Sequence, residues 1–338
     1  MGLYRLFLAV LVAISHVGIR FYGYNPGLVA VISFFLLSGY VMTVLIEKHY
    51  KQPSAIPTFY LDRAARLFPQ FMFYMVLAFI CIYFFKINTP NTNLLSFSKW
   101  LLNFLILPLG YFMYWESNGA LVIPQAWSLG LEMTFYMVIP WILVYCSKRQ
   151  IFGLAGISFL VFLAAYLGMI NTNYFGLRLL PGTLFMFLTG SAFFENDIYS
   201  RKFRAIIFLL AGSLLVIAFF NKQLYQLPYS KDVLVGLLVG ILAINFLRHV
   251  NFSSIDEFFG NLSYGVFLNN FIVIWIMQRF FAVNKFGATH VVILLLASCV
   301  LALCSFFFVE RPALRWRHAI RYGTKQSQPK LPVKQTTQ

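Results

Sequence analysis

Charged residues are scarce in this sequence. Asp, Glu, Lys and Arg together make up 11% of its 338 residues, whereas about 25% is typical of a soluble domain. Hydrophobic residues make up 60%, including 39 Phe, and the mean hydropathy is +0.77. Several apolar runs are long enough to cross a bilayer, which takes about 20 residues. The composition therefore excludes an ordinary soluble domain and predicts an integral membrane protein surrounded by lipid.

Acidic residues are the scarcest charged type, with 10 Asp and Glu against 26 Lys and Arg and a net charge of +16. Such an excess of positive charge can indicate nucleic-acid binding, but zinc-finger spacing and aromatic RNA-binding motifs are both missing. In a membrane protein, Lys and Arg are typical of cytoplasmic loops. We therefore expect no nucleic-acid partner.

Cysteine is also rare. The sequence has four, Cys81, Cys146, Cys299 and Cys304, each in or at the end of an apolar segment. No two of them have CxxC spacing, so they read as small core hydrophobes. We expect neither a disulfide framework nor a metal site.

The apolar runs predict an all-α, polytopic bundle of about ten transmembrane helices. Their approximate limits are 3–19, 27–46, 68–86, 128–146, 151–170, 178–195, 204–220, 232–248, 262–282 and 289–309. Ten crossings place both termini on one side of the membrane, and 18 of the 26 Lys and Arg residues then fall on that side. Because positive charge is enriched in cytoplasmic loops, both termini are predicted to be cytoplasmic.

The bundle is expected to form one transmembrane domain over residues 1–321, with no second domain after it. Residues 322–338 are rich in Lys, Gln, Pro and Thr, which predicts a disordered cytoplasmic tail. An external stretch at residues 87–127 has a polar start at 88–93. Its apolar middle at 100–114 could form a re-entrant or interfacial helix, because Pro108 and Gly110 would break a full span.

The first apolar segment carries Arg5 and His16. Eleven positions at about 100° each bring the two side chains to one face of a helix, roughly 16 Å apart along its axis. Ionisable residues inside a membrane usually point into the bundle and indicate a pathway or reaction centre. The alternative is that Arg5 reaches the headgroups while His16 is a hydrogen-bonded core residue.

Two further motifs lie on the second segment and in the cytoplasmic connection that precedes the third. FFLLSGYV contains Ser38 and Gly39, small residues that could serve close helix packing. FYLDRAARLFP contains Arg63 and Arg66, neighbours on one helix face. Two such Arg suit bidentate phosphate contacts, although positive-inside anchoring with Asp62 as a local counter-charge is the alternative.

Two carboxylates in apolar surroundings also need an explanation. WSLGLEMTFY places Glu132 just inside a span, with Tyr136 four residues on and on the same face. Glu132 could have a catalytic role, or it could be hydrogen-bonded to a Tyr, Trp or Arg at the interface or paired with Arg5. VERP places Glu310 at the end of the last span, where the helix dipole disfavours an anion. We therefore expect it to pair with an Arg such as Arg63, Arg66 or Arg311. Pro312 predicts a helix boundary.

Together these motifs resemble acyltransferase family 3, whose members are membrane-bound. Arg and His separated by ten residues, FFxLSGY, RxxRLxP, WSLxxExxFY and ERP all occur in family order between residue 4 and about residue 316. The ninth segment, NLSYGVFLNNF, resembles the family's SYxxYLxH element through Ser263 and Tyr264. It departs from that element at Asn270, where the family often has His. Asn can hydrogen-bond but cannot carry a proton at neutral pH.

The resemblance implies an O-acyltransferase that moves an acyl group, usually acetyl from acetyl-coenzyme A, to a sugar hydroxyl of an O-antigen, capsule or exopolysaccharide precursor, often lipid-linked. It implies a multi-pass protein of the bacterial inner membrane without a metal. We expect His16 to act as general base with Arg5 and Glu132 in the catalytic set. Arg63 and Arg66 would bind donor phosphates, and Ser38, Tyr136, Ser263, Tyr264, Asn270 and Glu310 would support the site.

Two other functions fit the same residues. A proton-coupled secondary transporter could use Arg5, His16, Glu132 and Glu310 as a relay, although the sequence shows no internal repeat of the transporter kind. A non-catalytic scaffold is the second alternative, if Asn270 reflects a decayed site.

Overall fold

The structure, a computed structural model, describes residues 1–87, 97–115, 121–250, 253–283 and 285–316. In this part of the chain the fold is all-helical, as predicted, and the one β-bridge joins Phe21 to Tyr24. The longer helices are α1 (Gly2–His16), α2 (Pro26–His49), α3 (Ile56–Tyr83), α7 (Ala126–Tyr145), α8 (Lys148–Tyr166), α9 (Leu180–Ser191), α10 (Ile198–Phe220), α12 (Ser230–Leu247), α13 (Ser254–Phe280) and α14 (Ala288–Ser305).

Eight helical stretches of the described residues are long and apolar enough to cross a membrane, judged by length and composition. They comprise α2, α7, α8, α10, α12, α13, the stretch Pro53–Tyr83 that contains α3, and the stretch Ala288–Trp316 that contains α14. The chain is therefore a multi-pass membrane protein. Two of the predicted spans are shorter helices, α1 with 15 residues and α9 with 12, so the total of ten and the side of the termini stay predictions.

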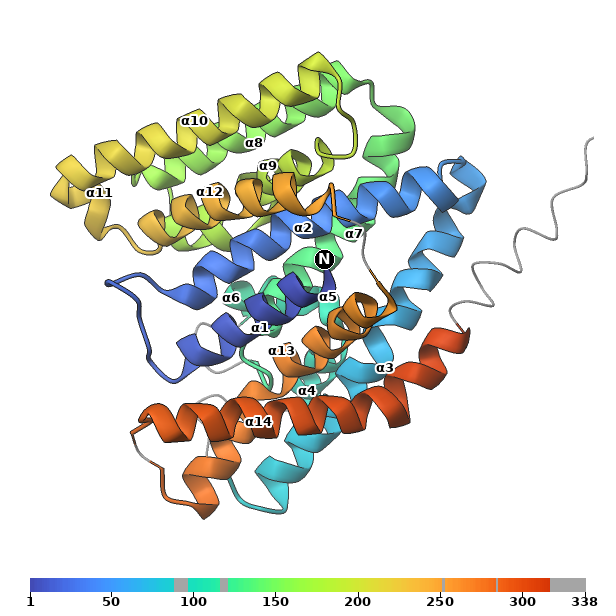
Figure 1. The fold of residues 1–338 in the computed structure, drawn as a ribbon, viewed down its shortest axis with the longest axis vertical. Coiled ribbons are helices and arrows are strands. Elements are labelled where there is room, and N and C mark those ends of the chain that lie inside the picture. Colours follow the sequence, from blue (N-terminus) through green and yellow to red (C-terminus); the bar gives the residue numbers. More distant parts are fainter. Residues whose placement is uncertain (88–96, 116–120, 251–252, 284, 317–338) are drawn as a thin grey trace, which may run out of the picture.

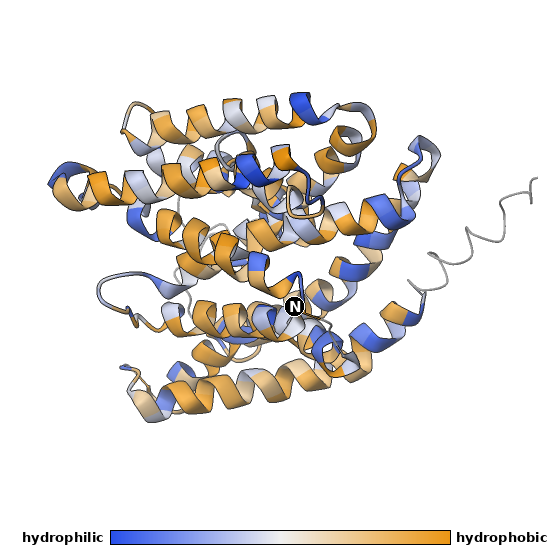
Figure 2. Ribbon diagram, turned by 45° about the horizontal axis from the view of Figure 1, so that its top comes forward, coloured by the Kyte–Doolittle hydropathy of each residue, from blue (hydrophilic) through white to orange (hydrophobic). Residues whose placement is uncertain are grey.

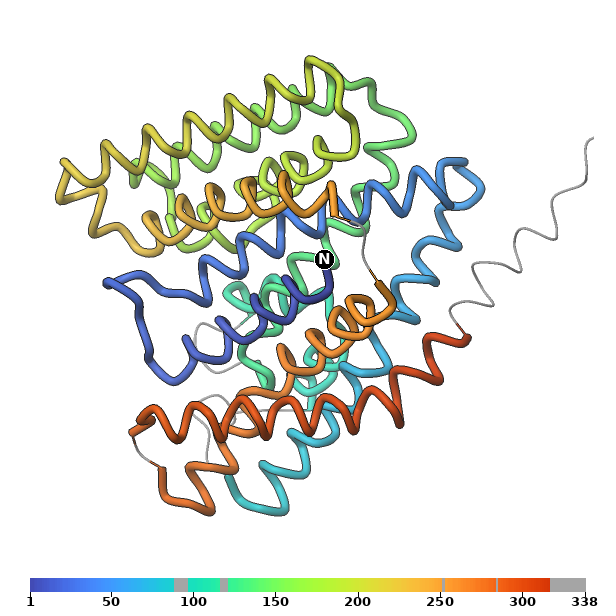
Figure 3. The backbone as a smooth tube through the Cα atoms, in the orientation of Figure 1, coloured from blue at the N-terminus to red at the C-terminus, as the bar shows by residue number. Residues whose placement is uncertain are grey.

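Helix α2 runs through the middle of the bundle and joins its two halves (Figure 1). On one side it packs against α9 and α12, which α8 and α10 cover. On the other side it packs against α1, which lies against α13, and α13 in turn packs against α14 and α3. The smooth trace in Figure 3 shows that α1 and α13, far apart in the sequence, lie side by side.

Close approach of α2 and α9 depends on glycine. A Cβ added to Gly39 would lie 1.8 Å from the carbonyl oxygen of Phe187, and one added to Gly190 would lie 1.8 Å from that of Leu36. Only residues without a side chain let the two backbones meet in this way. The packing role considered for the small residues of FFLLSGYV is thus confirmed for Gly39.

The lipid-facing surface is apolar along the helices, and polar residues gather at the helix ends (Figure 2). Large side chains such as Phe220, Phe246 and Phe308 are 73–83% exposed. In water, an apolar surface of this extent would promote aggregation, whereas in a bilayer it faces acyl chains.

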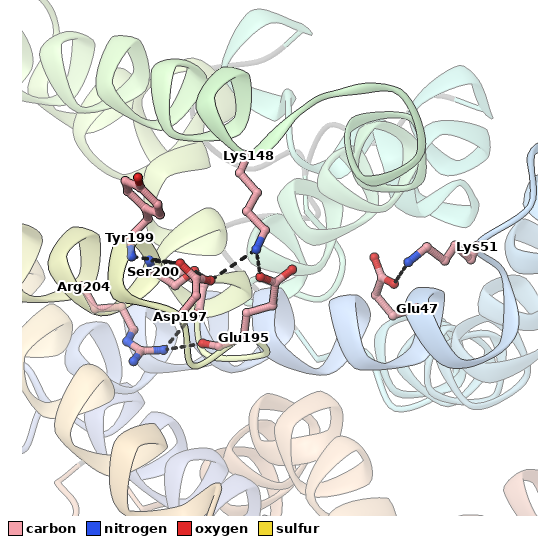
Figure 4. Close-up of polar contacts among 9 residues, drawn as sticks. Glu47, Lys51, Lys148, Glu195, Asp197, Tyr199, Ser200 and Arg204 are labelled. Atoms are coloured by element: carbon pink, nitrogen blue, oxygen red, sulfur yellow. Dashed lines mark hydrogen bonds and ion pairs between the residues drawn. The ribbon is translucent and has the colours of Figure 1, made fainter.

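One end of the bundle carries a surface cluster of charges (Figure 4). Asp197 caps α10 by accepting hydrogen bonds from the backbone N–H groups of Tyr199 (2.8 Å) and Ser200 (3.1 Å). Lys148, at the start of α8, pairs with Glu195 and Asp197. Hydrogen bonds from Ser200, with a further contribution from Lys148, hold the pKa of Asp197 well below its usual range. These contacts fix the ends of three helices on one face.

The same face carries two further contacts of the kind typical of a membrane boundary. Lys51 pairs with Glu47 at 2.7 Å, which raises the pKa of Lys51. Arg204 donates to the backbone carbonyl of Ala192 at 2.6 Å. The sequence places the cytoplasm on this face.

Two predicted helix limits were wrong. The third span was expected at 68–86, but α3 begins at Ile56, has Pro57 in its first turn and continues through Pro69. A helix bound on several sides tolerates the one hydrogen bond that Pro69 removes. Pro312 was expected to mark a helix end; the chain instead takes a π-helical turn, η3 (Phe306–Glu310), and stays helical to Trp316.

The external stretch forms short helices instead of one span. These are α4 (Phe97–Phe104), α5 (Ile106–Leu109) and α6 (Phe112–Trp115). The break after Leu109 was expected, and the glycine that follows, Gly110, meets Gly130 of α7 at close range. The polar start at 88–93 and the tail at 322–338 lie outside the described residues. The remaining short elements are η1 (Pro53–Ala55), η2 (Tyr174–Arg178) and α11 (Lys222–Gln226).

Candidate functional site

A cavity of about 380 Å³ lies between α1, α2, α3, α7 and α13. It collects most of the residues that the sequence singled out, although they come from five helices. Those that line it are Arg5, Ser38, Arg63, Arg66, Glu132, Tyr136, Ser263 and Tyr264. Three others, His16, Asn270 and Glu310, are not part of its lining.

Glu132 is the carboxylate of the cavity wall on α7. Its Oε1 atom accepts hydrogen bonds from Ser38 Oγ and from Tyr136 OH, both at 2.5 Å. The two hydroxyls are also 3.3 Å apart. Both neighbours thus donate to the same carboxylate oxygen, which fixes the position of the side chain. Of the alternatives considered for Glu132, the hydrogen bond to a Tyr is thus present, with Tyr136 as the donor, and Ser38 adds a link to α2.

Arg5 faces this group from α1. No hydrogen bond or ion pair within the described residues engages its guanidinium, so the considered pairing with Glu132 does not form. A cation that lines a cavity in the apolar interior without an anionic partner is costly to keep. Such a group favours an anionic ligand in the cavity.

Arg63 already has an anionic partner. Its Nε donates to Oδ2 of the neighbouring Asp62 at 3.0 Å, its Nη2 donates to the same atom, and both side chains are buried. The counter-charge role considered for Asp62 is confirmed. Arg63 still lines the cavity, so its positive charge is present but largely balanced.

Arg66 and Glu310 form an ion pair across the bundle. The pairing expected for Glu310 is confirmed, and its partner is the second Arg of the RxxR pair. Arg66 also approaches Asn261 Oδ1 at 3.5 Å and lies 5.5 Å from the ring centre of Tyr264. Tyr264 in turn donates from its OH to the carbonyl of Leu67 at 3.1 Å.

Ser263 is the last of the expected residues on the cavity wall. Its Oγ donates to the carbonyl of Gly260 one turn earlier on α13 at 2.7 Å. The hydroxyl is thus used within its own helix. Its part in the site is to provide a small polar surface.

His16 lies at the end of α1 and contacts α13. Its Nδ1 is 2.8 Å from Asn270 Oδ1, and its ring lies 4.3 Å from that of Phe271. Phe267 is the cavity-lining residue farthest along α13, and Asn270 follows it by about one turn, roughly 4.5 Å. The structure therefore places His16 just beyond the inner end of the cavity, whereas Arg5 lies within it.

Sequence reasoning missed two residues that build the site. The Asp256 carboxylate accepts hydrogen bonds from the backbone N–H groups of Gly2 (2.7 Å) and Leu3 (2.9 Å), which caps α1 at the edge of the cavity. Gln125 Nε2 donates to the carbonyls of Phe267 and Leu268 at 2.8 and 2.9 Å. An acid in the first turn of a helix and a Gln before another are both ordinary, so neither carried a sequence signal.

The described residues contain no group of three or more His, Cys, Asp or Glu that could hold a metal ion. The cavity lining instead offers positive charge from three Arg, hydroxyls such as those of Ser38 and Tyr136, and three carboxylates. The carboxylates belong to Glu132 in the wall and to Asp256 and Glu257 at the start of α13. This set fits a ligand that combines anionic groups with a polar, uncharged arm.

Comparison with known proteins agrees with this picture. The sequence model of one family, described as an acyltransferase domain, matches residues 2–310. An uncharacterised protein of Aquifex aeolicus is 36% identical over 163 residues, covering 46% of this chain and 72% of its own length. The peptidoglycan O-acetyltransferase OatA of Listeria monocytogenes is 24% identical over 345 residues, covering 90% of this chain and 54% of its own length.

A Bacillus subtilis relative, YrhL, is 24% identical over 329 residues, covering 85% of this chain and 50% of its own length. The chain thus spans about half the length of OatA and YrhL. No solved structure matches the chain.

Proposed function

The chain belongs to acyltransferase family 3, and on that premise we propose that it moves an acyl group from an acyl-coenzyme A to a hydroxyl of a cell-envelope glycan. Acetyl is the proposed acyl group, because OatA is named an O-acetyltransferase. The proposed acceptors are O-antigen, capsule or exopolysaccharide precursors and peptidoglycan, the last from the name of that relative. The proposed location is the bacterial inner membrane.

The observation that carries the proposal is the guanidinium of Arg5, which has no hydrogen bond or ion pair among the described residues. It lies in a cavity that Arg63 and Arg66 also line. The diphosphate of coenzyme A supplies the anionic charge that these groups favour. Arg63 and Arg66 have carboxylate partners of their own. We therefore assign the main phosphate contact to Arg5 and a supporting one to the RxxR pair, which differs from the roles that the sequence suggested.

The proposed reaction uses His16 as general base. A sugar hydroxyl is a weak nucleophile, so its proton must leave as its oxygen attacks the thioester carbonyl. His16 takes that proton, the new C–O bond forms, and the C–S bond breaks. The proton then passes to the thiolate of coenzyme A, which leaves as the free thiol. His is the side chain whose ordinary pKa suits this exchange at neutral pH.

The positions of the residues give the two substrates separate approaches. Arg5, Arg63 and Arg66 lie on the wall of the cavity, on the side where the sequence places the cytoplasm, and acyl-coenzyme A is made there. His16 lies beyond the inner end of that cavity, toward the other side of the membrane. The pantetheine arm is long and uncharged, so it can pass between helices while the diphosphate stays with the arginines.

The test uses the purified full chain with radiolabelled acetyl-coenzyme A and a cell-envelope glycan extract. The proposal predicts label on the glycan, together with release of free thiol. A secondary transporter or a scaffold would give neither label on the glycan nor thiol release. That result, obtained with protein shown to be folded, would overturn the proposal.

A further inference from the structure

Asn270 is completely buried, and all of its side-chain polar atoms have partners. Its Nδ2 donates to the carbonyl of Phe267 at 2.7 Å and approaches that of Val266 at 3.3 Å. Its Oδ1 lies 2.8 Å from Nδ1 of His16. This amide is therefore the link between the α13 backbone and the only ring nitrogen of His16 with a hydrogen-bond partner among the described residues.

The orientation of this amide follows from the chemistry of its neighbours. Backbone carbonyl oxygens can only accept hydrogen bonds. The end of the Asn270 side chain that faces Val266 and Phe267 must therefore be the NH₂ group, because an oxygen there would meet two other oxygens. Gln125 Nε2 also donates to the Phe267 carbonyl, at 2.8 Å, which helps to hold this carbonyl in place.

With the NH₂ group used in this way, Oδ1 is the atom that meets His16, and an amide oxygen can only accept. Nδ1 of His16 must then be the donor, so it carries the proton. A neutral imidazole has one N–H and one lone pair. The lone pair therefore lies on Nε2, which has no hydrogen-bond partner among the described residues.

We propose that Asn270 is a positioning residue that holds His16 in its Nδ1–H tautomer, so that Nε2 is the atom that takes the proton of the acceptor hydroxyl. The inference rests on the proposed function, in which His16 is the base. Free imidazole favours the opposite tautomer, with the proton on Nε2, which would leave no lone pair toward the reaction. Fixing the tautomer of a catalytic His is a large effect where a second residue performs it.

An amide suits this task in a site without a second ionisable partner. Asn270 can accept from Nδ1–H, but it has no proton to exchange with the ring. The proton that Nε2 takes up therefore stays on His16 until the leaving thiolate receives it. The presence of Asn at this position thus does not indicate a decayed site; it fixes the base by a hydrogen bond alone.

The direct test is the tautomer itself, read from the ¹⁵N spectrum of histidine-labelled full-length protein in nanodiscs above pH 7. His16→Gln identifies the signals of His16 by their loss. The proposal predicts a protonated Nδ1 and an unprotonated Nε2 in the wild type, and a shift toward protonated Nε2 in Asn270→Leu. A protonated Nε2 in the wild type would overturn it. This readout needs no turnover, so it is independent of whether His16 is the base.

Kinetics test the consequence of the tautomer. For Asn270→Leu we expect kcat to fall by about 10²-fold, the lower end of what a positioned general base contributes, while KM for acetyl-coenzyme A stays within about twofold. Asn270→Asp should recover only part of the loss. A carboxyl oxygen can also accept from Nδ1–H, but the second oxygen then faces the Val266 and Phe267 carbonyls to which the amide donates. Wild-type kcat in Asn270→Leu would overturn the positioning role.

Asn269→Leu is the matched control. Asn269 is the adjacent residue, equally buried, and donates to the Ser298 carbonyl at 2.8 Å instead of contacting His16. It should lower the unfolding temperature but leave the His16 tautomer and kcat unchanged. Equal loss of kcat in the Asn269 and Asn270 variants would show a general structural effect and overturn the proposal.

Discussion

Arg66 and Glu310 form an ion pair between α3 and the π-helical turn that follows α14, although 244 residues separate them in the chain. Glu310 is 2% exposed and Arg66 is close to the cavity wall. The pair explains how two short motifs at opposite ends of the chain belong to one site. It holds the RxxR helix turn in position and balances part of its charge.

The first prediction concerns this pair. Glu310→Gln leaves the partly buried Arg66, which is 13% exposed, without its anionic partner, and breaking a buried ion pair costs about 3–5 kcal/mol of folding free energy. Arg66→Gln combined with Glu310→Gln removes both charges and should be more stable than Glu310→Gln alone. Thermal unfolding of the three purified proteins measures this order. A double variant less stable than the single one would contradict a charge-balancing role.

The second prediction concerns Arg5. If its guanidinium holds donor phosphates, Arg5→Ala should lose a charge-assisted contact of about 1.5–3 kcal/mol, which is about 10- to 150-fold in Kd. Arg5→Lys should recover part of the affinity, because Lys keeps the charge without the planar fork. Calorimetric titration with coenzyme A measures the affinity.

Arg201→Ala is the control for Arg5→Ala, because Arg201 is exposed at the start of α10 and its loss changes the net charge equally. It should bind coenzyme A as the wild type does. Equal weakening in both variants would mean that the effect of Arg5 is one of overall charge and not of contact.

The third prediction concerns the hydroxyls on Glu132. Tyr136→Phe removes one donor from a buried carboxylate oxygen that also accepts from Ser38, and such a loss costs about 1–3 kcal/mol. Ser38→Ala should have a similar effect. Because the two donors share one oxygen, the double variant should lose more than the sum of the single losses, as measured by thermal unfolding. Strict additivity would contradict the shared network.

The fourth prediction concerns the cap on α1. Asp256→Ala removes the acceptor for the Gly2 and Leu3 N–H groups, and the loss of a helix N-cap costs about 1 kcal/mol. Asp256→Asn keeps an acceptor and should cost less. Hydrogen exchange of the first turn of α1 should report the difference, and equal protection in both variants would contradict the capping role.

The fifth prediction concerns topology. Lys51 lies after α2 on the face of the bundle predicted to be cytoplasmic, and Lys222 lies after α10 on the opposite one. With an impermeant maleimide, Lys222→Cys should react on intact spheroplasts, whereas Lys51→Cys should react only after permeabilisation. The background labelling of the native cysteines is measured on protein that carries neither substitution. The reverse pattern would invert the topology and place Arg5 on the side without acyl-coenzyme A.

The sequence predicted the helices well where apolar runs are long, as in α2 and α14. It failed at the start of α3, because hydropathy reads Asp62, Arg63 and Arg66 as loop residues. In the helix Arg63 pairs with Asp62, Arg66 pairs with Glu310, and both arginines line the cavity. The sequence predicted that Glu310 pairs with an Arg, but only the fold shows that its partner is Arg66.

The site was predicted only in part, because contacts between distant residues decide how its side chains pair. Polar residues in apolar segments indicated which side chains matter, and most of them line one cavity. Their pairing was predicted only in part. Asp62 and Glu310 were considered as partners of Arg residues, and phosphate contacts were expected for Arg63 and Arg66. The fold gives each of these two arginines a carboxylate and leaves Arg5 without a hydrogen bond or ion pair among the described residues. Likewise, Asn270 departs from the family's sequence pattern, and only the fold shows that its amide contacts His16.

The most direct test of the account is acyl transfer by His16→Gln. Gln keeps the size and hydrogen bonding of the side chain but cannot take up a proton, so transfer should fall by about 10²–10⁴-fold. Binding of coenzyme A should stay at the wild-type level. His249→Gln, the same change at an exposed position after α12, should transfer normally. Transfer by His16→Gln at near the wild-type rate would contradict the central claim and move the base to another residue, with Glu132 the next candidate.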